Sequence, residues 1–354
     1  MTEPAPAGPP QGRGAPLGGG ERSSFPGGDP PAPAGPPQGR GAPLGGGERS
    51  SLRGGTFRKI VVVGVGLIGG SCALALKRAG CVGEVVGVGR TQANLDIAVA
   101  RGVVDRACTL DGDWTREVAD ADVVLVAAPV AQFPALFVAM SGALGARTLV
   151  TDAGSTKQDV IDAAAGALGA ALPRFVPGHP IAGTEHTGAA AAFPALFESR
   201  NVILTPIAET DPAATERIAA LWQACGARVT TLDATRHDAI FAAVSHLPHV
   251  LAFTLVAELA ARPDAAAYFD HAASGFRDFT RIAAGSPEMW RDIALANRDA
   301  LLTEIDGYAE ALAAARALIA EGDGEALAVL FGEASRARRA WEAARRQPVV
   351  EDKG

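Results

Sequence analysis

Residues 59–71 read Lys59-Ile-Val-Val-Val-Gly-Val-Gly-Leu-Ile-Gly-Gly-Ser71. The apolar run 60–63 predicts a buried parallel strand, and an apolar helix is expected to begin at the glycines. In a G-x-G-x-x-G motif the first glycine makes a tight turn, the second lets the backbone approach a pyrophosphate, and the third lets helix and strand pack closely. The strand before the motif and the helix after it favour a dinucleotide site over a plain turn. The expected cofactor contacts are Gly64, Gly66, Leu67, Ile68 and Gly69.

Length, charge and cysteine content narrow the class of protein. The chain has 354 residues, enough for two domains with hydrophobic cores, and a formal net charge of −7. It has no basic stripe, so we expect no nucleic-acid partner, and no uninterrupted apolar run reaches the length of a membrane span. The four cysteines form no C-x-x-C pair, which favours buried free thiols and no metal site. Without a hydrophobic signal segment, the protein is expected to be cytoplasmic.

Residues 1–54 are rich in Gly, Pro and Ala, and residues 4–24 recur unchanged as residues 31–51. This composition buries too little apolar surface to offset chain entropy, so we predict a disordered tail. The identical copies indicate a tandem duplication in the gene, or a misplaced start, rather than a folded repeat. We assign the tail no chemistry and expect a second, short tail at 346–354.

Between 55 and 233 strand and helix patterns alternate. This alternation predicts an α/β Rossmann-type doubly wound sheet. Asp211-Pro212 is typical of a helix start, and that helix should run to about Cys225. The predicted strands are 59–63, 84–88, 122–127, 147–151, 174–177, 201–205 and 228–232, with helices such as 69–80 and 91–101 between them.

After Asp233 only helices are expected, at 235–261, 287–319 and 324–345. Their apolar surface predicts an all-α dimerisation domain at 234–345, with a homodimer as the simplest assembly. Pro248 lies inside the first of these helices. It lacks an N–H and clashes with the preceding turn, so we expect a kink there.

Arg90 and Thr91 follow the second predicted strand, where NAD-preferring folds of this type carry an acidic residue. A guanidinium suits a ribose 2′-phosphate, or it could stack on the adenine. The alternative is a solvated arginine at a strand end. The sequence therefore favours NADP over NAD. Pro129 closes the predicted strand 122–127 at the sheet's carboxyl edge, where ligands cross.

Two loops after strands supply candidate catalytic groups. Ser155 forms a capping box with Gln158, and its hydroxyl, with Lys157, could also meet the nicotinamide end of a cofactor. His179 follows the strand 174–177 in Gly-His-Pro, where it has little room to be a core residue. Its pKa near neutrality suits a proton acceptor opposite a hydride acceptor, although a loop histidine bonded to backbone is the plainer interpretation.

The helical part carries further candidates. His246 and His249 are spaced to share a metal, but no nearby thiol or carboxylate completes a ligand set. Asp278 could neutralise Arg277 and leave Arg281 free for a substrate carboxylate, held by two hydrogen bonds. The alternative for this segment is a surface network of ion pairs.

Together these motifs resemble the prephenate/arogenate (cyclohexadienyl) dehydrogenase family, over about residues 58–345. The histidine and arginine motifs are specific to it, while residues 1–54 lie outside the resemblance. The matching segments are Gly64-Val-Gly-Leu-Ile-Gly-Gly-Ser71, Asp152-Ala-Gly-Ser-Thr-Lys157, Gly178-His-Pro-Ile-Ala-Gly-Thr-Glu185, Ser245-His-Leu-Pro-His249, Gly275-Phe-Arg-Asp-Phe-Thr-Arg281 and Met289-Trp-Arg-Asp292.

The resemblance implies a Rossmann domain followed by a helical dimerisation domain. It implies oxidative decarboxylation of prephenate or arogenate with hydride transfer to NAD or NADP, giving 4-hydroxyphenylpyruvate or tyrosine in tyrosine biosynthesis. By this resemblance His179 accepts the proton of the substrate's ring hydroxyl, and Ser155 orients that hydroxyl beside the nicotinamide. Arg281 binds a substrate carboxylate, and His249 and Ser245 line the pocket near the substrate side chain. Glu185 has a less defined role.

Two other functions fit the layout. A β-hydroxyacid-type dehydrogenase also joins a nucleotide fold to helices, but relies on a Gly-x-x-Gly-x-x-x-Lys helix that 235–261 lacks. A regulator that senses NAD(P) without turnover would need no pairing of His179 with Arg281.

Overall fold

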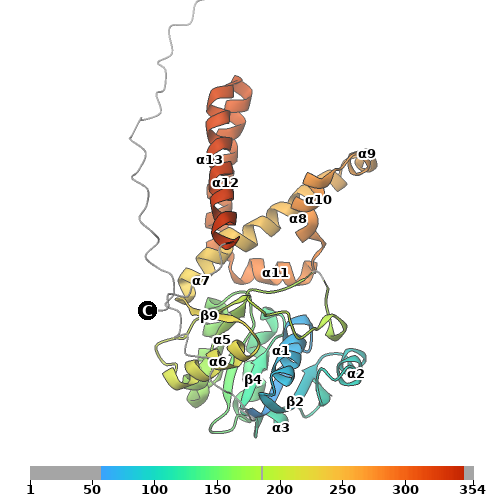
Figure 1. Ribbon diagram of the computed structural model, residues 1–354, viewed down its shortest axis with the longest axis vertical. Helices are drawn as coiled ribbons and strands as arrows, with labels where there is room; N and C mark the ends of the chain where they lie inside the picture. Colours follow the sequence, from blue (N-terminus) through green and yellow to red (C-terminus); the bar gives the residue numbers. More distant parts are fainter. Residues whose placement is uncertain (1–56, 185, 347–354) are drawn as a thin grey trace, which may run out of the picture. The chain divides into compact units, whose positions relative to one another are not determined.

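A computed structural model describes residues 57–184 and 186–346. Within that range a doubly wound α/β part is followed along the chain by helices only (Figure 1), which confirms the predicted fold class. The tail 1–54, almost all of the second tail and Glu185 lie outside the described residues. The domain boundaries themselves, 55–233 and 234–345, stay predictions.

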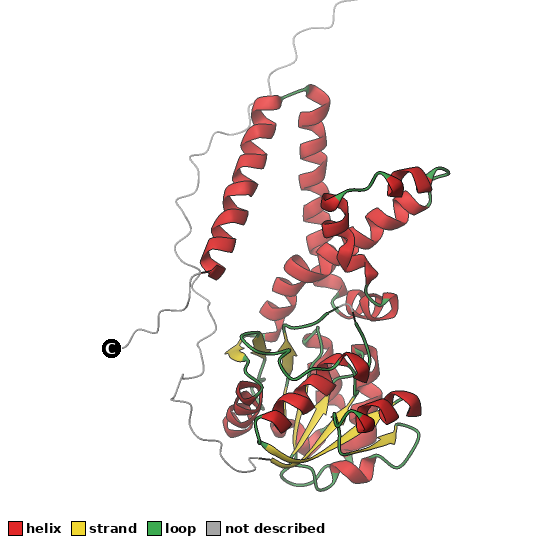
Figure 2. Cartoon of the chain, turned by 45° about the vertical axis from the view of Figure 1, so that its right-hand side comes forward, coloured by secondary structure: helices red, strands yellow, loops and turns green. Residues whose placement is uncertain are grey.

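The main sheet has six parallel strands in the order β3-β2-β1-β4-β5-β6. Figure 2 shows the helices on both sides of the yellow strands. The strands are β1 (Phe57–Val63), β2 (Val82–Gly89), β3 (Arg106–Thr109), β4 (Val123–Val126), β5 (Leu149–Asp152) and β6 (Phe175–Val176). The helices are α1 (Leu67–Arg78), α2 (Gln92–Ala100), α3 (Thr115–Val118), α4 (Phe133–Ser141), α5 (Gln158–Ala167) and α6 (Pro212–Ala224), with short turns η1 (Val130–Gln132), η2 (Gly169–Arg174) and η3 (Ala189–Ala191).

Alternate residues of β1 enter two separate apolar cores. Ile60 and Val62 pack on one face of the sheet, and Val61 and Val63 on the other. A strand covered on both faces needs a continuous apolar run, which is why the sequence revealed it. The sequence predicts no strand at the edge position of β3, because Arg106 is exposed, the other three residues are only partly buried, and they form no such run.

A second sheet has the order β7-β8-β9, from β7 (Gly178–Pro180), β8 (Asn201–Leu204) and β9 (Arg228–Thr231). β7 pairs antiparallel to β8, and β8 pairs parallel to β9. The expectation of a loop around His179 is therefore wrong. Gly178 and Pro180 hide the strand in the sequence, since proline is tolerated only at sheet edges such as this one.

The remaining helices are α7 (Ala234–Phe241), α8 (Leu247–Ala260), α9 (Ala265–Asp270), α10 (Ser274–Thr280), α11 (Pro287–Ala296), α12 (Arg298–Glu321) and α13 (Gly324–Arg346), with the turn η5 (Arg281–Ala284). The π-helical turn η4 (Ala242–His246) joins α7 to α8 just before Pro248, and thus accommodates the missing N–H. The single helix predicted at 287–319 is wrong. Asn297 leaves helical geometry and separates α11 from α12.

The continuous helix Ala234–Ala260 is long and apolar enough to cross a membrane, by length and composition only, and 28% of its most apolar stretch is buried. No uninterrupted apolar run was found there, because His, Asp and Ser interrupt it. The absence of a membrane partner and the cytoplasmic location stay predictions.

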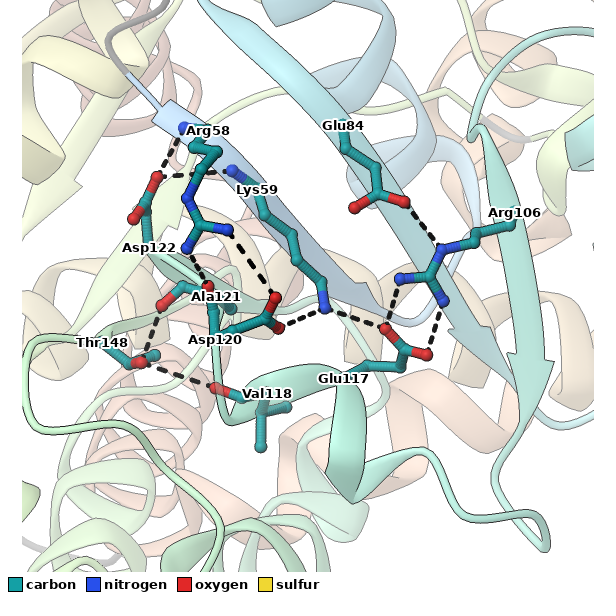
Figure 3. A network of polar contacts seen from close by, with 10 residues as sticks. All are labelled: Arg58, Lys59, Glu84, Arg106, Glu117, Val118, Asp120, Ala121, Asp122 and Thr148. Carbon is teal, nitrogen blue, oxygen red and sulfur yellow. Dashed lines mark hydrogen bonds and ion pairs between the residues drawn. The ribbon is translucent and has the colours of Figure 1, made fainter.

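At the amino edge of the main sheet, ion pairs join β1, β2, β3 and α3 (Figure 3). The Lys59 side chain is 5% exposed, and its Nζ donates to Glu117 at 2.9 Å and to Asp120 at 2.5 Å. Arg106 donates to both carboxylate oxygens of Glu117, at 2.5 and 2.6 Å, and to Glu84 at 2.7 Å. The bonds from Arg106, then those from Lys59, lower the pKa of Glu117 to about 2. The buried lysine is thus fully compensated.

Glu117→Gln is expected to lower the free energy of unfolding by about 1–3 kcal/mol near pH 7, because it removes the anion shared by two cations. The folded-state pKa of Glu117 is depressed, so its contribution is complete above the ordinary value of 4.5 and is lost as the pH falls through about 2. Urea unfolding at neutral pH and at about pH 3 measures the change, which should shrink in acid. Glu84→Gln, a more exposed carboxylate, is the control with a loss below about 1 kcal/mol. An equal loss for Glu117→Gln at both pH values would contradict the assignment.

Candidate active site

The turn after β1 has a shape that only glycines allow. Gly64 has φ +101°, and a Cβ there would lie 2.4 Å from the carbonyl oxygen of Ala127. A Cβ at Gly69 would lie 2.4 Å from the carbonyl oxygen of Gly64. A Cβ at Gly66 would meet nothing within 4 Å. Packing within the chain therefore requires Gly64 and Gly69, whereas Gly66 faces open space, as expected of a glycine that a pyrophosphate approaches.

The N-terminus of α1 offers hydrogen-bond donors beside that space. Leu67 and Ile68 open the helix, no side chain caps it, and its first turn has no acidic residue. Uncapped N–H groups and the positive end of the helix dipole attract phosphate. These residues fit a dinucleotide cofactor.

Arg90, Thr91 and Pro129 lie at the same carboxyl edge of the sheet, after β2 and β4. Arg90 is exposed and makes no hydrogen bond or ion pair within the described residues. Thr91 precedes α2 without capping it through its side chain. The strand order reverses between β1 and β4, and doubly wound sheets bind ligands at that reversal.

The predicted capping box at Ser155 is wrong. The carboxylate of Asp238, from α7, accepts instead from the backbone N–H of Lys157 at 2.9 Å and of Gln158 at 2.8 Å. An ionised carboxylate forms stronger bonds to these N–H groups than a hydroxyl does. The half-buried Ser155 makes no hydrogen bond in the part of the chain that the structure describes, so its hydroxyl is available to a ligand.

Lys157 is a structural residue rather than a ligand at the sheet edge. Its side chain is fully buried, pairs with the carboxylate of Asp152 and donates to the carbonyl oxygen of Gly178 at 2.7 Å. Asp152 also accepts from the N–H of Gly154 at 2.7 Å and of Gly178 at 2.9 Å. This satisfied buried pair ties the end of β5 to the start of β7, and so positions His179.

His179 is buried, with 9% of the residue exposed. Its Nδ1 lies 2.8 Å from Nε2 of His237, and Nδ1 of His237 lies 2.8 Å from Oδ1 of Asp238. Phe241 packs on both rings, with centroid distances of 4.7 and 4.5 Å. Nε2 of His179 has no hydrogen-bond partner among the described residues. His179 thus bonds a side chain through one nitrogen and leaves the other free.

Both imidazoles are neutral near pH 7. Burial is the main cause that lowers the pKa of His179 well below 6.5, and the neighbouring His237, Lys157 and His246 lower it further. Burial also lowers the pKa of His237, in spite of Asp238. A neutral imidazole keeps one lone pair, which is what a proton acceptor requires.

A pocket of about 260 Å³ lies between α8 and α11, and most of its lining is apolar. His246 lines it and is also close enough to His179 to lower the pKa of that residue. α11 contacts η1, which directly follows Pro129, so the pocket adjoins the carboxyl edge of the sheet. The lining includes His246, His249, Val250, Phe253, Trp290 and Arg291.

The two pocket histidines are engaged separately. His249 stacks on Trp290 with ring centroids 3.4 Å apart, and its Nδ1 lies 2.8 Å from the carbonyl oxygen of Ser245. His246 Nδ1 lies 3.1 Å from the amide nitrogen of Asn297. Among the described residues no cluster of three potential metal ligands forms.

Arg281 lies near His249, and after burial it is one cause that lowers the pKa of that histidine. Arg277 pairs with Asp278 at 3.8 Å, whereas Arg281 has no ion-pair partner within 57–184 and 186–346. Arg281 does not line the pocket, whereas Arg291 does. The position of Glu185 is outside the described residues.

Sequence reasoning missed His237, Asp238, Asn297 and the stacking role of Trp290. A His-Asp dipeptide near a helix start was the only local signal for the first two. It could not show that the histidine meets another one 58 residues earlier.

Comparison with known proteins agrees with this architecture. Residues 72–231 match the nucleotide-binding domain of prephenate dehydrogenase, and residues 233–333 match the dimerization domain of prephenate dehydrogenase. The two matches follow each other along the chain, and the second begins just before α7.

Individual relatives cover most of the chain. A cyclohexadienyl dehydrogenase from Zymomonas mobilis is 37% identical, over 80% of this chain and 96% of its own length. A prephenate dehydrogenase from Aquifex aeolicus, solved with hydroxyphenyl propionate and NAD+, is 34% identical with a TM-score of 0.75, over 80% of this chain and 98% of its own. An arogenate dehydrogenase from Synechocystis is 29% identical with a TM-score of 0.67, over 80% and 99%.

Proposed function

Because the chain belongs to the prephenate dehydrogenase family, we propose that it catalyses the oxidative decarboxylation of prephenate, arogenate or both. The observation that carries the proposal is a buried, neutral His179 with one free nitrogen, near a pocket and at the sheet edge shaped for a dinucleotide. Family membership removes the β-hydroxyacid alternative. A sensing regulator without turnover becomes an outcome of the test below.

In this reaction the carbon that bears the ring hydroxyl gives a hydride to the nicotinamide, which the bound cofactor supplies as acceptor. Nε2 of His179 takes the hydroxyl proton as the O–H bond breaks. The bond to the ring carboxylate then breaks, CO2 leaves and its electron pair completes the aromatic ring. The product is 4-hydroxyphenylpyruvate from prephenate or tyrosine from arogenate, a step of tyrosine biosynthesis.

Other residues receive roles in substrate binding. Ser155, whose hydroxyl has no partner among the described residues, would orient the ring hydroxyl beside the nicotinamide. His249 and Ser245, held together by a hydrogen bond, would border the substrate side chain. Arg281 would hold a carboxylate, since it is unpaired within the described residues and lies near His249. Glu185 stays a candidate for the same pocket.

The cofactor is a nicotinamide dinucleotide, and we infer a preference for NADP. The support is Arg90, exposed and unpaired within the described residues where an acidic residue would bind the 2′-hydroxyl of NAD. The Aquifex relative was solved with NAD+, so both cofactors have to be assayed.

The helical part forms a homodimer in this proposal. Its match to a dimerization domain agrees with apolar side chains that are exposed on α12 and α13, two long helices that are joined by a short turn and diverge from it (Figure 2). Burial of these side chains against a second copy would stabilise the dimer. They include Leu302, Tyr308, Leu312, Ile319, Val329, Leu330, Phe331 and Trp341.

His179→Asn should lower kcat by about 10²–10⁴-fold, because the amide cannot take a proton. Cofactor affinity should survive, since the glycine turn is untouched. Steady-state assays with prephenate and arogenate, and cofactor titration by fluorescence, measure both quantities. Undiminished turnover in the variant would remove His179 as the proton acceptor. Tight cofactor binding by the native chain with no turnover of either substrate would favour the regulator.

Arg281→Ala should raise the Michaelis constant for substrate by about 10–100-fold, as expected for one lost charge-assisted bond of about 1.5–3 kcal/mol. Arg277→Ala is the matched control, because that neighbouring arginine already pairs with Asp278. The Michaelis constant of Arg277→Ala for substrate should match that of the native enzyme. An unchanged value in Arg281→Ala would move carboxylate binding to Arg291.

Arg90→Ala should lower kcat/KM for NADP by about 10–100-fold and leave kcat/KM for NAD within about threefold, because only the 2′-phosphate loses a charged partner. Both cofactors are compared at one saturating concentration of the better substrate. A native enzyme that prefers NAD, or a variant equally impaired with both cofactors, would contradict the NADP preference.

A further inference from the structure

Three buried side chains form a line that ends at the proton acceptor. Asp238 contacts His237, and His237 contacts His179, each through one short hydrogen bond of 2.8 Å. From this geometry we infer that Asp238 and His237 are positioning residues that fix the tautomer of His179, so that Nε2 carries the lone pair before substrate arrives. The inference rests on the proposed function for its consequence in turnover, but the tautomer itself can be observed without turnover.

The line begins at a group that can only accept hydrogen bonds. Asp238 is held as an anion by the backbone N–H of Lys157 and of Gln158, at the N-terminus of α5. Burial raises the pKa of Asp238, but the bonds from His237 and from these two N–H groups outweigh it, and the net pKa lies below the ordinary value. Asn297 donates to the backbone oxygen of Asp238 at 2.8 Å and so fixes this residue from the start of α12.

The hydrogen-bond partner of each neutral ring then determines which of its two nitrogens carries the hydrogen. The carboxylate accepts, so Nδ1 of His237 must carry a hydrogen. His237 is neutral, so its Nε2 has none and accepts from Nδ1 of His179. His179 is also neutral, so its single hydrogen is on Nδ1 and its Nε2 is unprotonated. The opposite tautomer would place two lone pairs against each other at 2.8 Å.

Packing prevents the rings from turning out of this arrangement. His237 is fully buried, and Phe241 lies against both imidazoles. The other charged or titratable groups that act on the pair are Lys157, Asp152 and His246. Lys157 donates to Asp152 and to a backbone oxygen, and is not hydrogen-bonded to either ring.

The fixed tautomer matters because the wrong one cannot take a proton. When the substrate hydroxyl gives its proton to Nε2, His179 becomes an imidazolium with hydrogens on both nitrogens. Its Nδ1–H remains bonded to His237, and through that ring the new positive charge faces the anion of Asp238. No further reactant is needed, and the proton returns to the phenolate oxygen of the product.

His246 provides a contrast within the same chain. Its Nδ1 accepts from the amide of Asn297 at 3.1 Å, so its hydrogen must be on Nε2. His249 donates from Nδ1 to the carbonyl oxygen of Ser245. The structure therefore assigns the Nδ1–H tautomer to His179, His237 and His249, and the Nε2–H tautomer to His246.

Long-range proton–nitrogen NMR of the native, full-length protein with 15N-labelled histidine tests the tautomers directly. The chain has six histidines, which single substitutions can assign. We expect protonated Nδ1 and unprotonated Nε2 in His179 near pH 7, and the reverse pattern in His246. A protonated Nε2 in His179, or the same pattern in both residues, would overturn the inference.

Kinetics of two variants test the consequence. His237→Gln keeps an oxygen that can accept from His179, whereas His237→Leu fills similar space without an acceptor. Turnover should fall by about 10²-fold or more in His237→Leu and recover to within about tenfold of native in His237→Gln, with the Michaelis constant for cofactor unchanged in both. Melting temperatures show whether each variant folds, and the NMR result stands independently if His237→Leu does not.

The outcomes separate this inference from the proposed function. If the native protein turns over substrate and the two folded His237 variants lose turnover equally, the proposed function is supported and the positioning role of His237 is overturned. Absence of native turnover with either substrate, together with the expected tautomers, would reject the function and retain the hydrogen-bond line.

Discussion

The site depends on one residue, Asp238, that joins three helices through its carboxylate and its backbone oxygen. Asp238 lies in α7. Its Oδ1 accepts from the backbone N–H of Lys157 and bonds Nδ1 of His237, and its Oδ2 accepts from the backbone N–H of Gln158 at the start of α5. The backbone oxygen of Asp238 also accepts a hydrogen bond from the side-chain amide of Asn297, at the start of α12. Burial of an anion is costly unless every lone pair finds a donor, and here donors come from backbone and side chain together. The helices that follow the nucleotide fold are thereby tied to its carboxyl edge.

A second buried charge positions His179 from the opposite direction. Lys157 and Asp152 are both fully buried, and their bonds to Gly178 bring the start of β7 against the end of β5. His179 is the next residue, and it is thus held by the backbone on one side and by His237 on the other. The Asp238 carboxylate and the Lys157–Asp152 pair, each buried and hydrogen-bonded, therefore fix the position of the neutral His179. The amino edge of the sheet uses ion pairs differently, because Lys59 and Arg106 there share Glu117 far from the carboxyl-edge residues.

Local patterns predicted most of the fold. The run 60–63 and the glycines after it placed β1 and α1, since a strand buried on both faces must be continuously apolar and its tight turn must be glycine. Elements with weak local patterns were missed or misread. The half-exposed β3, the three-residue β7 and the break at Asn297 are each set by neighbours from other parts of the chain. Ser155 shows the same limit, because a carboxylate from α7 replaced the cap that its spacing indicated.

The sequence by itself determined the doubly wound sheet, the dinucleotide turn, the helical second part and the identity of His179 as the candidate base. These properties rest on residues close together in the chain, where spacing and residue type decide backbone conformation. The tertiary structure alone decided which nitrogen of His179 is free, what caps α5 and which side chains form the pocket. Those properties depend on contacts between distant parts of the chain. The partners in two of the hydrogen bonds are separated by 58 and by 81 positions, and bonds across such separations leave no periodic pattern in a single sequence.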